Sequence, residues 1–325
     1  MFGAMGARER SELRGTVLDD RYQLGTTIGV GGTGVVFEAT RIADGESVVV
    51  KVMRPVYAYN ADLVARLMRE AEVARRVSHA GIVAALDNGQ LEDGSPYLVM
   101  ERLYGESLAR LLLREGTLST ADTAVIAMRV TNILDASHAR GYVHRDIKPE
   151  HILLDRSPTG ALTVSLIDFG VCAAETMPHA SREAERGRVY GTPTYCSPEQ
   201  ASGNPDVDGR ADVFGLGVVL FECLAGKVPY SASNVTALLK RIIREDAPRV
   251  CLAAHNVTRE MDELVARALS REPEGRFRST RALRRALRVH AGDQRAVERN
   301  IARRLRVDKA APEWAETLPG EVVAA

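Results

Sequence analysis

His144-Arg145-Asp146-Ile147-Lys148-Pro149-Glu150-His151 is the stretch on which the interpretation of this chain depends. It places a carboxylate, Asp146, two residues before a lysine, Lys148. Lysine is scarce among the 43 basic residues, and the lysines are Lys51, Lys148, Lys227, Lys240 and Lys309. An ammonium group and a guanidinium group differ in shape and hydration. A lysine in a chain that otherwise uses arginine therefore points to a position where the ammonium group matters.

The overall composition is that of an ordinary globular protein. The chain has 325 residues, a mass of 35.4 kDa and 45% hydrophobic residues, which is enough for one large domain or two coupled lobes. Its 43 basic and 43 acidic residues cancel. No global field therefore draws the chain to nucleic acid or to an anionic membrane, and we expect no nucleic-acid partner.

The cysteines and the apolar runs favour a cytoplasmic protein without a membrane span. The four cysteines are Cys172, Cys196, Cys223 and Cys251. They are widely spaced and form no Cys-x-x-Cys pair, so we expect reduced thiols and no metal set. Residues 1–14 contain no apolar segment typical of a signal peptide. The longest apolar run, residues 213–221, is far shorter than the roughly 20 residues of a membrane span, and we expect a buried helix there.

Three glycines, Gly29, Gly31 and Gly34, form the pattern Gly-x-Gly-x-x-Gly. The same spacing precedes a helix in dinucleotide-binding folds. Here two strand-like segments follow, residues 35–39 and 47–52, joined by an Asp-Gly turn, which favours a glycine-tipped hairpin. Glycines at such a tip let backbone amides approach phosphates closely, and an ordinary hairpin turn is the equally weighted alternative.

A lysine and a glutamate in the next two elements are candidates for an ion pair. Lys51 ends a strand-like segment, and an amphipathic helix is predicted from about Asn60, which serves as its N-cap. Glu70 lies among the apolar positions of this helix, where a lone carboxylate is costly unless it is paired. Pairing with Lys51 explains both residues. The alternatives are a solvated Glu70 at the edge of the apolar stripe, or Glu72 as the partner.

Further along, a strand-rich part gives way to a helical part. We predict strands over residues 82–87 and 96–100 and one long helix over residues 119–140. The boundary between the two parts is expected near residues 103–108. Active sites commonly form in the cleft between two such units.

Four more motifs follow the opening stretch in order. They are Asp168-Phe169-Gly170, then Gly191-Thr192-Pro193-x-Tyr195-x-Ser197-Pro198-Glu199, then Asp212 at the head of the predicted buried helix, then Arg276-Phe277. Over residues 18–290 the chain resembles the bacterial eukaryotic-like (Hanks-type) serine/threonine protein kinases. The resemblance implies an α+β, bilobal protein kinase fold with a small antiparallel β-rich N-lobe and a helical C-lobe.

The resemblance also implies a division of the chain. It gives an N-terminal leader at 1–17, a kinase N-lobe at 18–103, a kinase C-lobe at 104–290, and a basic helix with a flexible tail at 291–325. In the last segment Val297, Ile301 and Leu305 recur at four-residue spacing among arginines, which indicates an amphipathic basic helix. This helix either covers the C-lobe or binds a partner or an acidic membrane surface.

By this resemblance the site residues have defined roles. Lys51, oriented by Glu70, holds the α and β phosphates of ATP, and Asp146 accepts the proton of, or orients, the substrate hydroxyl. Lys148 neutralises the transferred phosphoryl group and is typical of kinases that act on Ser or Thr of a protein substrate. Asp168 binds Mg²⁺. The expected ATP contacts are Ile28, Gly29, Gly31, Gly34, Val36, Val49, Lys51, Glu101, Leu103 and Leu153. The glycines cover the phosphates, Lys51 holds them, and the others surround adenine or bond to it.

His151 departs from the family pattern, in which this loop ends in Asn. By the resemblance that Asn binds a second Mg²⁺, whereas imidazole nitrogen suits Mn²⁺, Co²⁺ or Zn²⁺ better. Three outcomes are open, namely a weak kinase, a kinase that prefers Mn²⁺, and a nucleotide-binding pseudokinase that acts as a scaffold. The other catalytic positions are present, which favours phosphotransferase activity. A small-molecule kinase is disfavoured because Lys148 and residues 191–199, which look built to dock a peptide, would be unexpected there.

The activation segment, residues 168–199, also departs from the family pattern. Arg145 next to the catalytic aspartate usually implies an activation-loop phosphate, with which it pairs. The stretch that would carry the phosphate reads Glu183-Ala184-Glu185-Arg186-Gly187-Arg188 and has no hydroxyl. Either Glu183 or Glu185 substitutes for the phosphate, or this is a solvated, mobile charged loop, which the sequence favours slightly. Thr176 and Ser181 are then the sites left to test.

Several single residues complete the expectations. Glu199 and Arg276 are expected to form a buried ion pair, and Thr192 to hydrogen-bond within the catalytic loop. Three histidines are expected to be unremarkable helix-end or loop residues with no ligand partners, namely His79, His138 and His255.

Overall fold

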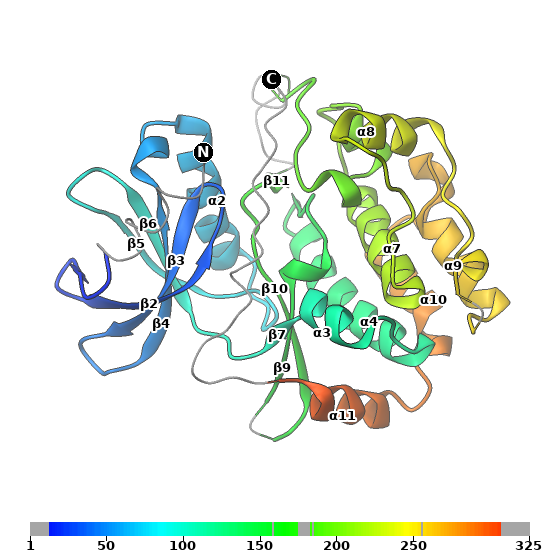
Figure 1. Cartoon of the computed structure of the whole chain (residues 1–325), viewed down its shortest axis with the longest axis horizontal. Helices are drawn as coiled ribbons and strands as arrows, with labels where there is room; N and C mark the ends of the chain where they lie inside the picture. The colour runs from blue at the N-terminus through cyan, green and yellow to red at the C-terminus, as the bar shows by residue number, and fades with distance from the viewer. Residues whose placement is uncertain (1–12, 158, 175–182, 184, 255, 307–325) are drawn as a thin grey trace.

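The computed structural model describes residues 13–157, 159–174, 183, 185–254 and 256–306. These residues form two lobes, an antiparallel sheet with one long helix and a larger, mainly helical part (Figure 1). The predicted α+β architecture, strand-rich first and helical second, is confirmed.

The N-terminal lobe is built on a six-stranded antiparallel sheet with strand order β1-β2-β3-β4-β6-β5. Its strands are β1 (Val17–Leu18), β2 (Tyr22–Val30), β3 (Gly34–Arg41), β4 (Ser47–Met53), β5 (Ala85–Gln90) and β6 (Pro96–Glu101). The hairpin tip between β2 and β3 is closed by a 2.8 Å hydrogen bond from Gly31 N to Gly34 O. Gly34 has no room for a side chain, because a Cβ would lie 2.5 Å from the carbonyl oxygen of Val52 on β4.

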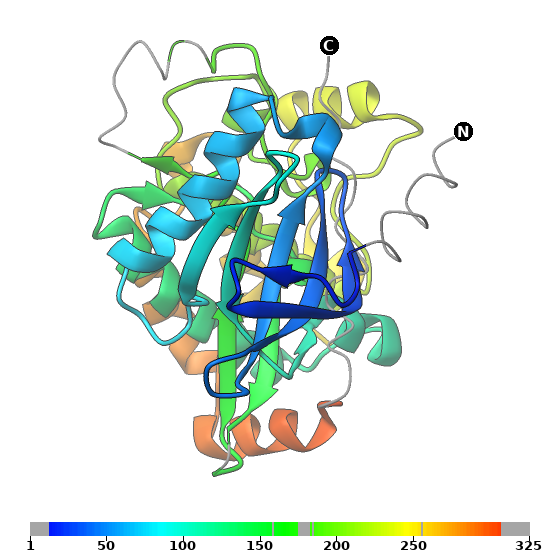
Figure 2. The same ribbon diagram turned by 90° about the vertical axis from the view of Figure 1, so that its left-hand side faces the viewer.

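Helix α2 (Ala61–Arg76) covers one face of this sheet, as Figure 2 shows from the side. Neighbouring residues on a strand point to opposite faces, so Val36 packs with Leu67 and Ala71 of α2 whereas Phe37 packs in the cluster on the other face. Asn60 caps the helix as predicted, since its side chain accepts a backbone N–H of the first turn at 3.2 Å.

The strand predicted over residues 82–87 begins later, at Ala85. The preceding loop bonds to the other lobe instead. Gly81 O accepts a 2.7 Å hydrogen bond from Leu166 N, and Ile82 forms an isolated bridge with the same Leu166. Backbone groups engaged there are not available to the sheet. Local sequence shows only the apolar run and not this distant partner.

Helices α4 and α7 form the centre of the C-terminal lobe, which contains α3 (Leu108–Glu115), α4 (Thr120–His138), α6 (Pro198–Ala201), α7 (Arg210–Ala225), α8 (Val235–Arg244), α9 (Arg259–Ala268), α10 (Thr280–Leu287) and α11 (Gln294–Arg304). Residues 213–221 lie in α7 and are all buried, so the predicted buried helix is confirmed. A helix that is apolar on all sides belongs in the core. In the part of the chain that the structure describes, no helix has the length and apolar character of a membrane span.

Short strands at the junction bring the motifs together. β7 (Glu106–Ser107), β9 (Ile152–Arg156) and β10 (Leu162–Leu166) form one small sheet, and β8 (Tyr142–Val143) pairs with β11 (Ala173–Ala174). Residues 144–151 lie between β8 and β9, and residues 168–170 lie between β10 and β11. The two pairings therefore place the two motifs side by side. Single 3₁₀ turns lie at η1 (Pro55–Tyr57), η2 (Pro149–His151), η3 (Pro193–Tyr195), η4 (Val250–Leu252), η5 (Pro273–Gly275) and η6 (Arg288–His290).

Helix α11 packs against α4, β9 and β10 at the base of the C-terminal lobe (Figure 1). Ile301 and Leu305 are buried, and Arg304 forms ion pairs with Glu115 at 2.6 Å and Asp122 at 2.8 Å. Of the two alternatives for the basic helix, covering the C-terminal lobe is therefore the one observed. The arginines left exposed on it are Arg295, Arg299 and Arg303. The rest of the predicted segment 291–325, from residue 307 on, lies outside the described residues.

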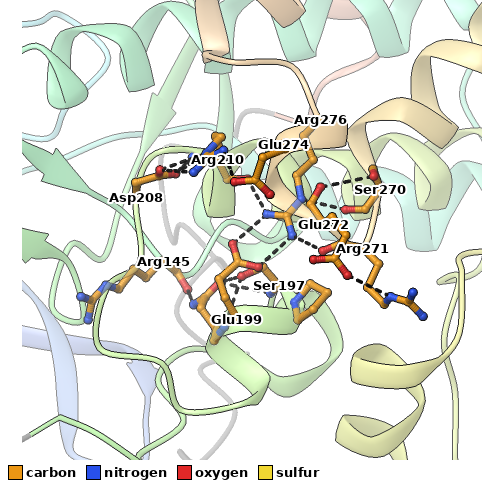
Figure 3. Close-up of polar contacts among 12 residues, drawn as sticks. Arg145, Ser197, Glu199, Asp208, Arg210, Ser270, Arg271, Glu272, Glu274 and Arg276 are labelled. Atoms are coloured by element: carbon orange, nitrogen blue, oxygen red, sulfur yellow. Dashed lines mark hydrogen bonds and ion pairs between the residues drawn. The ribbon is translucent and has the colours of Figure 1, made fainter.

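The predicted ion pair between Glu199 and Arg276 is present and buried (Figure 3). Two guanidinium nitrogens of Arg276 contact the two carboxylate oxygens of Glu199 at 2.7 and 2.8 Å. The remaining N–H groups donate to the carbonyls of Ser270 at 2.8 Å, Arg210 at 3.0 Å and Arg271 at 2.9 Å. All five donors of this arginine are thus paired, and the end of the activation segment is joined to the last part of the lobe.

Replacing Arg276 with Met should lower the free energy of unfolding by about 3–5 kcal/mol, because Glu199 remains as a buried charge without its partner. Urea denaturation followed by circular dichroism measures this loss. The control is Arg259→Met, whose side chain is 87% exposed and pairs with Glu263 on the surface, and which should lose less than about 1 kcal/mol. Equal stability of Arg276→Met and wild type would contradict a structural role for the pair.

Candidate active site

Asp212 fixes the backbone of the catalytic stretch. Its carboxylate is buried at the start of α7 and accepts hydrogen bonds from the backbone N–H groups of His144 at 2.9 Å and Arg145 at 2.8 Å. Arg145 has a left-handed backbone with φ of 67°, which needs support from its surroundings. The side chain of Gln200 donates to the Arg145 carbonyl at 2.7 Å. Both backbone polar groups of this strained residue are therefore paired.

His138, which the sequence marks only as an unremarkable helix-end residue, is a further partner of Asp212. Its Nε2 lies 2.7 Å from Asp212 Oδ2. Gly209 makes room for the ring, since a Cβ there would lie 2.8 Å from it. Burial acts to lower the pKa of His138, but the hydrogen bond and charge of Asp212, with Asp135 and Asp208 nearby, outweigh burial and raise it. No local signal marks this contact, because His138 and Asp212 are 74 positions apart in the chain.

The other two histidines expected to be unremarkable are His79 and His255. His79 Nε2 lies 2.9 Å from the side-chain amide of Asn132 on α4, and its Nδ1 accepts from Gly81 N at 3.0 Å. His79 thus holds the loop before β5 against the C-terminal lobe, which the sequence did not predict. His255 lies outside the described residues.

Asp146 and Lys148 are held together by Thr192. Asp146 Oδ1 accepts from Thr192 N at 2.7 Å, its Oδ2 lies 3.1 Å from Lys148 Nζ, and Lys148 donates to Thr192 Oγ1 at 2.6 Å. The predicted bonding of Thr192 to this loop is confirmed. Burial acts to raise the pKa of Asp146, but the basic groups of His151 and Lys148 outweigh it and lower it. Asp146 is therefore an ionised carboxylate that can accept a hydrogen bond or a proton.

Lys51 and Glu70 form the predicted ion pair, with 2.9 Å between Nζ and Oε2. Both side chains are largely buried. Lys51 Nζ also lies 3.8 Å from Asp168 Oδ1, so the pair links α2 to the second motif. Glu72, the alternative partner, instead contacts the hydroxyl of Tyr142 at 3.2 Å.

Asp168, the first residue of the second motif, is an ionised carboxylate. Its backbone is left-handed, with φ of 63°, and the next residue, Phe169, is buried against the ring of His144 with centroids 4.5 Å apart. Burial acts to raise the pKa of Asp168, but the Lys51 ammonium and the other basic groups around it outweigh burial and lower it strongly. Such a carboxylate is suited to bind a divalent cation.

The ring of His151 directs an unprotonated nitrogen, Nε2, toward Asp168. Its Nδ1 lies 3.0 Å from the carbonyl oxygen of Asp146 and must donate to it, because a carbonyl only accepts. Burial lowers the pKa of His151 to about 4, so the ring is neutral at neutral pH and Nε2 carries the lone pair. This Nε2 is buried, has no hydrogen-bond partner within the described residues, and lies 3.5 Å from Asp168 Oδ2. A nitrogen and a carboxylate oxygen so placed form a donor set for a cation.

An apolar cavity of about 440 Å³ adjoins these groups. It is lined by Val36, Lys51, Glu70, Val83, Met100, Glu101, Leu103, Leu153, Ile167 and Asp168. Four of the predicted adenine contacts are among them, whereas Ile28 and Val49 pack in the same apolar cluster without lining the cavity. Val83, Met100 and Ile167 were missed, because they meet only when β6 and the segment after β10 fold together.

A larger and more polar cavity, of about 920 Å³ when space open to solvent is included, continues from the apolar one. Its walls include the backbone of residues 31–34, together with Lys51, Asp146, Lys148 and Asp168. Of the three glycines expected to cover the phosphates, Gly31 and Gly34 line this cavity. Gly29 lies back in the sheet opposite Val36 and is not among the lining residues. The two compartments meet at Lys51 and Asp168. Together they suit an elongated ligand with a flat apolar end and a polyanionic end.

Comparison with known proteins agrees with this geometry. Residues 22–287 match the family described as the protein kinase domain. The chain is 31% identical over 297 residues to serine/threonine-protein kinase pkn3 of Myxococcus xanthus, covering 90% of this chain and 54% of that protein. It is 34% identical over 279 residues to serine/threonine-protein kinase PknB of Mycobacterium leprae, covering 85% of this chain and 44% of that protein. The chain spans about half the length of the curated relatives it matches.

Replacing His138 with Gln should destabilise the protein more in mild acid than in mild base. The folded pKa of His138 is raised, so its contribution to stability is fully present below the unfolded value of about 6.5 and is lost as the pH rises through the folded pKa. Urea denaturation of both proteins at about pH 6 and about pH 9 brackets this range.

The matched control is His290→Gln. Burial lowers the pKa of His290, so its stability difference from wild type should change with pH in the opposite sense. A stability difference for His138→Gln that is the same at both pH values would show that the imidazolium does not hold Asp212.

Proposed function

Because the chain belongs to the protein kinase family, we propose that it is an ATP-dependent serine/threonine protein kinase that transfers the γ-phosphoryl group to a protein hydroxyl. The observation that carries the proposal is that the Lys51–Glu70 pair and the Asp146–Lys148 pair face one polar cavity. The proposal includes an N-lobe of residues 18–103 and a C-lobe of residues 104–290.

ATP binding is assigned to the two connected cavities. Adenine fits the apolar compartment between Val36 and Leu153, where the backbone at Glu101 and Leu103 offers hydrogen bonds. The phosphates then lie in the polar compartment beneath residues 31–34, within reach of Lys51. Glu70, 2.9 Å from the ammonium of Lys51, holds it at this place.

Phosphoryl transfer then follows from the positions of two side chains. The acceptor hydroxyl hydrogen-bonds to the carboxylate of Asp146, and its oxygen forms a bond to the γ-phosphorus while the bond to the β-phosphate oxygen breaks. The hydroxyl proton passes to Asp146, and ADP carries the electron pair of the broken bond. Lys148, 3.1 Å from Asp146, stabilises the charge on the transferred group. Such a lysine favours Ser or Thr as the acceptor.

The residues present fit a divalent cation. Asp168 supplies an ionised carboxylate, and His151 supplies a buried nitrogen with no hydrogen-bond partner in the described part of the chain. When bound, the cation neutralises charge on the phosphates. Mg²⁺ prefers oxygen donors whereas imidazole suits Mn²⁺. We therefore assign Mg²⁺ or Mn²⁺ to Asp168 and expect His151 to shift the preference toward Mn²⁺.

A pseudokinase scaffold is the alternative, and His151 is the feature that raises it. The ionised Asp146 and the intact Lys51–Glu70 pair favour catalysis over this alternative. A cytoplasmic location is part of the proposal, because the enzyme consumes ATP and all four cysteines are free thiols.

Incubation with radiolabelled ATP and a generic protein substrate tests the proposed activity. Label should appear on Ser or Thr of the substrate, and Asp146→Ala should lower the rate by about 100-fold or more, because the group that takes the proton is lost. Asp246→Ala, at a side chain that is 87% exposed, is the control and should keep the wild-type rate. Nucleotide binding without label transfer would instead indicate the scaffold.

His151→Asn should raise turnover with Mg²⁺ more than with Mn²⁺, because an amide oxygen replaces a ring nitrogen beside Asp168. Initial rates of both proteins with each metal measure this, and electron paramagnetic resonance of bound Mn²⁺ reports affinity separately from turnover. His290→Asn serves as the control. Unchanged rates with either metal would remove His151 from the metal site.

A further inference from the structure

We propose that Glu185 takes the place of an activation-loop phosphate, so that residues 185–192 are held against the catalytic loop without phosphorylation. The inference rests on the proposed kinase function and concerns the regulation of the same site. Glu185 is a positioning residue, because it acts through Arg145 and not on the substrate.

Arg145 is a buried cation that needs a partner. Its side chain is only 4% exposed, and one terminal nitrogen lies 2.7 Å from a carboxylate oxygen of Glu185, itself only 12% exposed. Its Nε is buried without a hydrogen-bond partner in the described residues. A buried charge is unfavourable unless it is neutralised. Loss of the Glu185 carboxylate would therefore leave the Arg145 guanidinium without its counter-charge.

Glu185, and not Glu183, occupies this position. Glu183 lies 2.8 Å from Arg186, three residues along, and its side chain is 37% exposed. Such exposed local pairs contribute little to structure. Of the two glutamates considered from the sequence, Glu185 contacts the catalytic loop and Glu183 pairs with Arg186 of its own segment. The expectation of a solvated loop is therefore wrong for Glu185, and Thr176 and Ser181 lie outside the described residues.

Two glycines hold the turn that carries Glu185. Gly187 N donates to Gly203 O at 2.9 Å, and both glycines have left-handed backbones, with φ of 78° and 67°. A Cβ on Gly203 would lie 2.6 Å from the Cα of Gly187, so only glycine allows this approach. The backbone contact between Gly187 and Gly203 thus helps to position the carboxylate of Glu185, in addition to its side-chain contact with Arg145.

The same segment is fastened to α2. Arg188 pairs with Asp62 in the first turn of α2 at 3.0 Å, and the guanidinium of Arg66 lies over the ring of Tyr190 at 5.1 Å. Nearer Asp168, Arg69 donates to the carbonyl of Cys172 at 3.2 Å. Since α2 carries Glu70 to Lys51, a segment held in place also holds that ion pair.

The segment reaches Asp146 through Gly191. A Cβ on Gly191 would lie 2.6 Å from the carbonyl oxygen of Arg145, and the next residue, Thr192, bonds both Asp146 and Lys148. Neutralising Arg145 therefore stabilises the contacts of the acid that receives the acceptor hydroxyl. In kinases whose activation loop is ordered by phosphorylation, a phosphate supplies the negative charge that pairs with the arginine. Here the carboxylate of Glu185 supplies that charge.

Initial rates of the phosphatase-treated full chain test this. Intact mass before and after the assay verifies that no phosphate is present. The wild type should keep its rate to within about twofold, whereas Glu185→Gln should lose about tenfold in kcat, equivalent to ~1.4 kcal/mol, with the KM for ATP unchanged. Glu183→Gln is the matched control and should behave as wild type. A double-mutant cycle adds a readout that a merely structural role would not move, since Glu185→Gln should cause no further loss in an Arg145→Met background.

The results that overturn the inference are distinct from those that overturn the kinase assignment. Loss of wild-type activity on phosphatase treatment, an unchanged rate for Glu185→Gln, or additive losses in the cycle would each refute the role of Glu185. A wild type without transfer activity in any state refutes the proposed function instead. Hydrogen exchange tests directly whether Glu185 holds this segment. Backbone amides of residues 186–191 should exchange faster in Glu185→Gln than in Glu183→Gln. Equal exchange would refute the inference as well.

Discussion

The buried carboxylate of Asp212 is the interaction on which both the C-terminal lobe and the catalytic loop depend. It accepts two backbone N–H groups of the loop and contacts His138 of α4. An ionised group in the core is tolerated only when its lone pairs are satisfied, and here three donors from two elements satisfy them. The left-handed backbone of Arg145 persists because these bonds over-determine it. The orientation of Asp146 is a consequence of that constraint.

The charges of the site explain why a cation belongs in it. Three carboxylates, those of Glu70, Asp146 and Asp168, face two ammonium groups, those of Lys51 and Lys148. Each ammonium lies beside a carboxylate, and one carboxylate is left in excess. A triphosphate brings further negative charge into the same cavity. Electrostatic repulsion in such a partly buried place is strong, and a divalent cation beside Asp168 removes it.

What could be predicted from the sequence depends on whether the signal was local. A carboxylate at an apolar helix position identified Glu70, and an isolated lysine identified its partner Lys51, because each breaks a pattern visible within a few residues. The contact of His138 gave no such signal, since the acid that explains it lies on another helix. Likewise, the segment that begins at Ile82 has the composition of a strand, but the backbone of Ile82 pairs with Leu166 of the other lobe. The fold class could therefore be predicted from the sequence. The contacts that support the site from other elements, such as that of His138 with Asp212, could be seen only in the tertiary structure.

The two buried arginines of the C-terminal lobe show why one contact suits regulation and the other does not. Arg276 has all five N–H groups paired, three of them with backbone carbonyls that no modification alters. Arg145 is equally buried, yet its Nε lacks a hydrogen-bond partner among the described residues and its charge is balanced by one side chain of the activation segment. A fully paired cation stabilises the fold whatever the state of the loop. A cation balanced by a single acid makes the position of that acid decisive. If Glu185 has the proposed role, the turn at Gly187 and Gly203, which positions Glu185, therefore controls how residues 185–192 contact the catalytic loop.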